Sequence, residues 1–137
     1  MTVADYLIDT SALARVLLGH NAAEWNDRIG AGLVAICDIT ELEVLHSARS
    51  LADRTRLKAT LDATYAWCPM PDSVYRRSRV VQEQLTAKGE HRSAGPVDLL
   101  VAAAAEEAGL TLLHCDRDFE TIARTTGQLV RMIDLRQ

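Results

Sequence analysis

The chain has 137 residues, of which 48% are hydrophobic and 25% are charged, with a formal net charge of −4 at pH 7. These values are typical of one globular domain, which we expect to span residues 1–137. The negative charge argues against a protein that holds nucleic acid through its overall field, but it allows a local acidic metal site that acts on phosphate. The longest apolar segment, Leu99–Ala105, is too short to cross a bilayer, so we expect no membrane association.

The cysteines indicate a reducing compartment. Cys37, Cys68 and Cys115 are odd in number and lie far apart in apolar segments, which is typical of reduced, buried thiols. The N-terminal residues also lack the basic flank and apolar core of a signal peptide. We therefore expect a cytoplasmic protein.

Strands and helices are expected to alternate along the chain, because apolar runs alternate with segments of three-four periodicity. In chain order, the expected elements are a strand at Val3–Ile8, a helix at Ala12–Leu18 capped by Thr10 or Ser11, a helix at Ala22–Ile29, a strand at Leu33–Cys37, a long helical region from Thr40 to Tyr65 with a break near Leu51–Asp53, a brief strand at Ala66–Met70, a helix that starts at Asp72 or Ser73 and ends at Gly89, a helix at Val97–Ala108 preceded by Pro96, a strand at Thr111–Cys115, a helix at Asp118–Thr125 and a strand at Gln128–Ile133. This order predicts an α/β fold, a three-layer sandwich with a mainly parallel central sheet flanked by helices.

Acidic residues recur where an expected strand passes into an expected helix: Asp9, Glu43, Asp98 and Asp116. Each has a local explanation, since Asp9 and Asp116 can cap helices, Thr40 and Glu43 have the spacing of a capping box, and Asp98 suits a helix N-terminus. In a parallel sheet, however, all these junctions lie at one rim. Acids gathered there repel one another unless a cation is bound.

Oxygen ligands without histidine or cysteine favour a hard divalent ion, Mg²⁺ or Mn²⁺. Such an ion lowers the pKa of a bound water and polarises a phosphodiester. The acidic rim therefore predicts metal-dependent hydrolysis of phosphodiesters.

The ordered segments that carry these acids resemble the PIN domain, and within it the VapC ribonuclease toxins of bacterial toxin–antitoxin pairs. The segments are 7–13, 39–43, 96–104 and 114–119, with the sequences LIDTSAL, ITELE, PVDLLVAAA and HCDRDF. The resemblance covers the whole chain in order and size. It implies an Mg²⁺- or Mn²⁺-dependent endoribonuclease that cleaves RNA, often structured RNA such as tRNA, and thereby inhibits translation and growth. It also implies a VapB-type antitoxin as partner and a homodimer.

The resemblance also assigns roles to residues. Asp9, Glu43, Asp98 and Asp116 fall on the family's acidic cluster, with Asp9, Asp98 and Asp116 as metal ligands. Thr10 or Ser11 falls where a hydroxyl supports the first aspartate. Glu41 competes with Glu43, which is preferred because the family pattern puts its glutamate three residues after the threonine. Asp118 is a supporting residue and competes with Asp116, which leaves the strand first and is preferred; the number of metal ions stays open.

Other residues are assigned more weakly. Arg92 and Arg117 lie beside the proposed rim and are candidates for RNA phosphate contacts. His20, His46, His91 and His114 lack a cysteine or second histidine at ligand spacing, which favours structural or exposed roles, and Trp25 and Trp67 are expected to pack. The alternative function is a PIN-fold binding module that no longer cuts RNA. A small-molecule phosphatase with paired aspartates is disfavoured, because Ser11 stands two residues after Asp9.

Overall fold

The computed structural model describes residues 4–19 and 22–133, except for the side chain of Ala22. Its elements are β1 (Tyr6–Ile8), α1 (Thr10–Leu17), α2 (Ala22–Gly30), β2 (Val34–Ile36), α3 (Asp38–His46), α4 (Leu51–Thr64), β3 (Ala66–Trp67), α5 (Ser73–Ala87), α6 (Pro96–Ala108), β4 (Thr111–His114), α7 (Arg117–Thr126) and β5 (Val130–Met132). Within these residues, no helix has both the length and the apolar character needed to span a membrane.

The strands form one five-stranded sheet in the order β3-β2-β1-β4-β5, with every neighbouring pair parallel. Strand β1 is central: Leu7 is in register with Ala35 of β2 on one side and with Leu112 of β4 on the other. The expected α/β sandwich is confirmed, and its sheet is wholly parallel.

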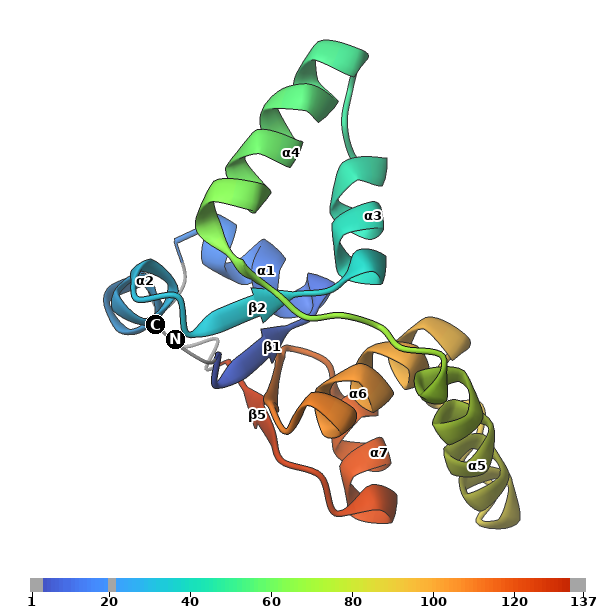
Figure 1. Cartoon of the computed structure of the whole chain (residues 1–137). Helices are drawn as coiled ribbons and strands as arrows, with labels where there is room; N and C mark the ends of the chain where they lie inside the picture. The colour runs from blue at the N-terminus through green and yellow to red at the C-terminus, as the bar shows by residue number, and fades with distance from the viewer. Residues whose placement is uncertain (1–3, 20–21, 134–137) are drawn as a thin grey trace.

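Alternating side chains of each strand enter two separate cores. Leu7 and Leu112 pack with residues of α5, α6 and α7, whereas their neighbours Ile8 and Leu113 pack with residues of α1–α4. This period of two is the geometry of a pleated strand that is buried on both faces. Helices thus cover both faces of the sheet and give three layers (Figure 1).

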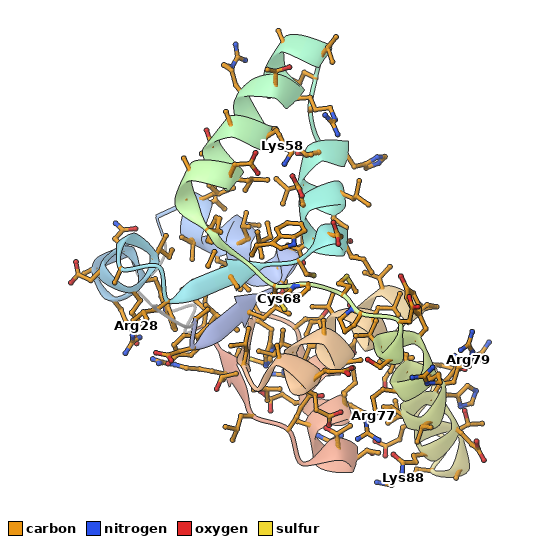
Figure 2. The ribbon with its side chains drawn as sticks, in the orientation of Figure 1. Arg28, Lys58, Cys68, Arg77, Arg79 and Lys88 are labelled. Atoms are coloured by element: carbon orange, nitrogen blue, oxygen red, sulfur yellow. The ribbon has the colours of Figure 1, made fainter. Side chains whose placement is uncertain are left out.

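Helices α3 and α4 together project away from the sheet (Figure 1). The ammonium of Lys58 on α4 joins them, lying 2.7 Å from Glu41 of α3 and 2.8 Å from Asp62 of its own helix. Figure 2 shows the Lys58 side chain between the two helices. Only one residue of α4, Leu61, is buried, so this ion pair holds a helix that otherwise contributes little to the core.

Several expected boundaries were wrong. Helix α3 begins at Asp38 and not at Thr40, because the chain turns directly after β2 and Cys37 takes the N-cap position. Thr40 is therefore fully buried inside the helix and forms no capping box with Glu43. Helix α1 begins at Thr10, with Asp9 rather than Thr10 or Ser11 as its cap.

Further differences concern the remaining boundaries and single side chains. The break in the long helical region falls before Leu51, where Ser50 caps α4 by accepting the Asp53 N–H. Each expected strand is longer than the observed one, and helix α7 begins at Arg117. Trp25 is buried as expected, but Trp67 is 50% exposed; Cys37 and Cys68 are buried thiols, whereas Cys115 is partly exposed. The expectations for Val3 and His20 lie outside the described residues.

Candidate active site

The candidate site lies where β1 and β4 end side by side. The chain leaves β1 into α1 and leaves β4 into α7, and these two helices pack on opposite faces of the sheet. Such a switch point leaves a crevice at the carboxyl ends of parallel strands, where open α/β sheets bind ligands. Asp9 follows β1 directly, and Asp116 lies two residues after the end of β4.

Asp9 is held in place by its own helix and by Ser11. Its Oδ1 accepts the Ala12 N–H at 3.0 Å, and the Ser11 hydroxyl donates to the carboxylate, with its oxygen 2.8 and 2.9 Å from the two carboxylate oxygens. Ser11 Oγ also accepts the Cys115 N–H at 2.9 Å, so one hydroxyl links the segment after β1 to the segment after β4. Burial raises the pKa of Asp9, and these donors oppose the rise.

Replacing Ser11 by alanine is expected to loosen this link. The change leaves the partly buried Cys115 N–H without its acceptor and should lower the free energy of unfolding by about 1–2 kcal/mol, as measured by urea denaturation. Ser93→Ala is the matched control, since its hydroxyl bonds only locally to the Glu90 carbonyl and should cost less. Equal losses in the two variants would contradict a special role for Ser11.

Three carboxylates converge beside Asp9. Asp98, in the first turn of α6, meets Asp116 and Asp118, and one oxygen from each lies within 4.8 Å of the others. Asp116 caps α7 by accepting the Asp118 N–H at 2.9 Å, which turns both side chains of this short segment to the same place. The three oxygens are close enough for one cation to bind them together.

The mutual repulsion of these acids shows in their pKa values. Burial, followed by the charges of Asp116, Asp118 and Asp9, raises the pKa of Asp98 to about 6. Burial and the neighbouring Asp116 also raise the pKa of Asp118. Asp9 lies outside the group of three, yet its charge reaches Asp98, so the four acids form one electrostatic cluster.

Glu43 is fixed at the same rim by a hydrogen bond to Thr10, a residue distant in the sequence. The Thr10 hydroxyl donates to Glu43 Oε1 at 2.8 Å, which places the α3 acid next to the residue that follows Asp9. Glu41, its competitor in the sequence, is instead buried against Lys58 of α4. The geometry therefore gives Glu41 a structural role and leaves the Glu43 carboxylate at the rim.

The acidic cluster has no basic partner in the part of the chain that the structure describes. The ion pairs found there involve Glu24, Glu41, Asp53, Asp62, Glu90, Glu106 and Glu120, but none of the rim acids. Figure 2 labels Arg77 on α5 and Lys88 directly after this helix; Arg77 binds Glu106, and Lys88 donates to Thr125. Divalent cations suit such a set of oxygen donors, and the residues present therefore fit a metal site.

Two residues, Asp118 and His114, contribute more to the site than the sequence indicated. Asp118 was expected as a supporting residue or as an alternative to Asp116, and the structure brings both carboxylates to Asp98. His114 was expected to have a structural or an exposed role, and its fully buried ring contacts the backbone of Asp116. Arg92 and Arg117 are exposed, on the α5–α6 connection and at the first position of α7.

Comparisons with known proteins decide the family. The sequence model of the PIN domain matches residues 6–125. The chain belongs to the PIN domain family. As a PIN domain it is 40% identical to ribonuclease VapC21 of Mycobacterium tuberculosis over 128 residues, which cover 93% of each chain. It is also 42% identical to ribonuclease VapC2 of the same organism over 130 residues, or 93% of this chain and 92% of that one. The PIN chain is thus of the VapC type.

Solved structures support the same fold for this PIN domain. The DNA-bound VapBC of Salmonella typhimurium matches with a TM-score of 0.75 and 21% identity, over 96% of this chain and 99% of that one. VapBC2 of Rickettsia felis, bound to a promoter DNA fragment, matches with the same TM-score and 16% identity, over 97% and 100%.

Proposed function

We propose that this PIN domain is an Mg²⁺- or Mn²⁺-dependent endoribonuclease that acts as the toxin of a VapBC-type pair. The observation that carries the proposal is the acidic cluster at the β1–β4 switch point, which lacks a basic partner within the described residues. The names of the M. tuberculosis relatives, which call them ribonucleases, support RNA as the substrate. Cleavage of cellular RNA would inhibit translation and growth.

The roles of the acids follow from their placement. Asp98 and Asp116 would bind the ion, with Asp118 completing the group and Asp9 contributing from the cap of α1. When bound, the ion would polarise the phosphodiester and lower the pKa of a water molecule. Glu43, held by Thr10, would complete the cluster or orient the attacking water. Attack by water would leave a 5′-phosphate and a 3′-hydroxyl.

Basic residues would hold the substrate. Arg117 stands between Asp116 and Asp118 in the sequence, and Arg92 lies shortly before α6, which carries Asp98. We propose that both exposed guanidinium groups contact RNA phosphates. These contacts would make RNA binding weaken as salt concentration rises.

The proposed partners are a VapB-type antitoxin and a second copy of the chain. The matched structures from Salmonella typhimurium and Rickettsia felis are VapBC assemblies, which supports an antitoxin. Large apolar side chains stand exposed, among them Leu42 next to Glu43 and, at the end of α1, Leu17 and Leu18, each more than 60% accessible. A groove lined by Thr10, Ile39, Leu42, Glu43 and His46 adjoins the Thr10–Glu43 bond. A partner chain bound there would cover apolar surface next to the acids.

The test is RNA cleavage by the purified chain with Mg²⁺, with Mn²⁺ and with excess EDTA. We expect fragments with 5′-phosphates in either metal and none in EDTA, because the ion would polarise the phosphodiester and activate the attacking water. Restoring Mg²⁺ should restore cleavage. Cleavage that is equal in EDTA would contradict the metal mechanism, and RNA left intact in both metals would favour the binding-module alternative.

A further inference from the structure

The ring of His114 is buried directly beneath the segment that carries Asp116 and Asp118. His114 ends β4, its side chain is 0% exposed, and its Nδ1 accepts the Asp116 N–H at 3.2 Å. It is therefore bonded to the backbone of a cluster acid without touching the carboxylates themselves.

This hydrogen bond fixes the tautomer of the imidazole. An Nδ1 that accepts carries no proton, so the neutral ring has its proton on Nε2. Nε2 lies 3.2 Å from Glu120 Oε1 on α7, and the ring lies tilted against Phe119 with centroids 5.3 Å apart. Within the described residues Nε2 makes no hydrogen bond, so the contact that orients the buried ring by hydrogen bonding is the one from Nδ1 to the backbone.

The segment that receives this acceptor sets the geometry of the cluster. The Asp116 N–H binds His114, while the Asp116 carboxylate accepts the Asp118 N–H. Together these two bonds fix the backbone orientation from which both carboxylates reach Asp98. A change in the first bond would move two of the three oxygens in the group.

We propose that His114 is a positioning residue for the metal site: its Nδ1 accepts the Asp116 N–H and thereby orients the Asp116 and Asp118 carboxylates toward Asp98. The inference rests on the proposed metal-dependent function. It adds that a neutral, buried histidine which binds neither metal nor RNA sets the affinity for the ion. Residues behind the ligands of metal sites commonly have such an effect, and their loss weakens metal binding by about 10–100-fold.

Three substitutions separate the acceptor from the bulk of the ring. His114→Asn places an amide oxygen at the position of Nδ1, His114→Gln places its polar group one bond further out, and His114→Leu removes the acceptor. We expect the Asp116 amide to exchange with solvent at least about tenfold faster in the Gln and Leu variants, with Mn²⁺ affinity lowered by about 10–100-fold. The Asn variant should stay within about threefold of wild type in both measurements.

The control is Ile122→Val, a change in the buried face of α7 that bonds nothing in the Asp116 segment. It should lower stability while leaving Mn²⁺ affinity and Asp116 exchange unchanged. Wild-type behaviour of His114→Gln, or an Asn variant as impaired as the Gln variant, would overturn the proposal.

A further readout needs no variant and no metal. Imidazole ¹⁵N shifts of the wild-type protein should show the proton of His114 on Nε2, and a proton on Nδ1 would overturn the proposal even if the variants fail to fold. A wild-type chain with the expected tautomer and exchange pattern that leaves RNA intact would instead refute the nuclease function and keep the positioning role.

Discussion

Asp98→Asn is expected to remove RNA cleavage, by about 10²–10³-fold or more, and at the same time to make the metal-free protein more stable. Activity falls because Asp98 is the acid that joins Asp116 and Asp118 in the group of three. Stability rises because, in the folded protein, burial and the charges of the acidic neighbours destabilise the ionised carboxylate. An amide of the same shape has no charge to repel.

The sign and size of the stability change follow from the pKa. In the unfolded chain the pKa of Asp98 is near its ordinary value of 3.8, whereas in the folded protein it is about 6. The folded state therefore binds the proton more tightly, and ionisation removes stability as pH rises from about 4 to about 6. Allowing for partial exposure to solvent, the Asn variant should gain about 1–2 kcal/mol at neutral pH.

Urea denaturation of the metal-free proteins checks this prediction. Asp72→Asn is the matched control, because Asp72 is exposed, makes no side-chain cap hydrogen bond and should change stability by less than about 0.5 kcal/mol. A less stable Asp98→Asn protein would show that Asp98 is not held in a repelling cluster. A variant that cleaves RNA as well as wild type would contradict the role of Asp98 in the active site.

The second large effect concerns pH and metal affinity. A divalent ion requires ionised carboxylates, so binding must displace the proton that Asp98 holds below a pH of about 6. Mn²⁺ affinity should change little above about pH 7 and fall by about tenfold per pH unit below 6. Bound metal should reverse the trend of the free protein, which loses stability as pH rises through the same range.

Calorimetric titration at several pH values measures this dependence. Repeating it in buffers with different heats of ionisation gives the number of protons released, which should approach one near pH 5 and fall toward zero near pH 8. Affinity that stays constant from pH 5 to pH 7 would contradict the raised pKa of Asp98. Circular dichroism spectra of the same samples show whether the protein stays folded, so that a loss of affinity caused by unfolding can be recognised.

The fold could be predicted largely because the hydrophobic pattern of a strand or a helix is a local property of the sequence. Leu7 and Ile8 belong to opposite faces of the sheet, and their short apolar strand could be read from the sequence. Helix starts were less predictable, since Cys37, which offers no side-chain cap, precedes α3, while Thr40 is buried one turn later. A capping residue in the sequence indicates a helix start only where packing leaves that residue free to act.

The site was predictable in its acids but not in their contacts. That Asp9, Asp98 and Asp116 share one rim follows from parallel strands. The bond from Thr10 to Glu43 and the inclusion of Asp118 depend on how distant segments pack. A structural role for His114 was among the expectations, but its partner could not be predicted, because a backbone N–H leaves no trace in residue spacing.

The most direct test is a calorimetric titration of the purified wild-type and Asp98→Asn proteins with Mn²⁺ near pH 7.5. Wild type should bind the ion and Asp98→Asn should bind it at least about tenfold more weakly, since one of three converging oxygens loses its charge. A wild-type chain that takes up no Mn²⁺ at millimolar concentration would mean that these carboxylates gather for another reason, and the nuclease assignment would fail with it.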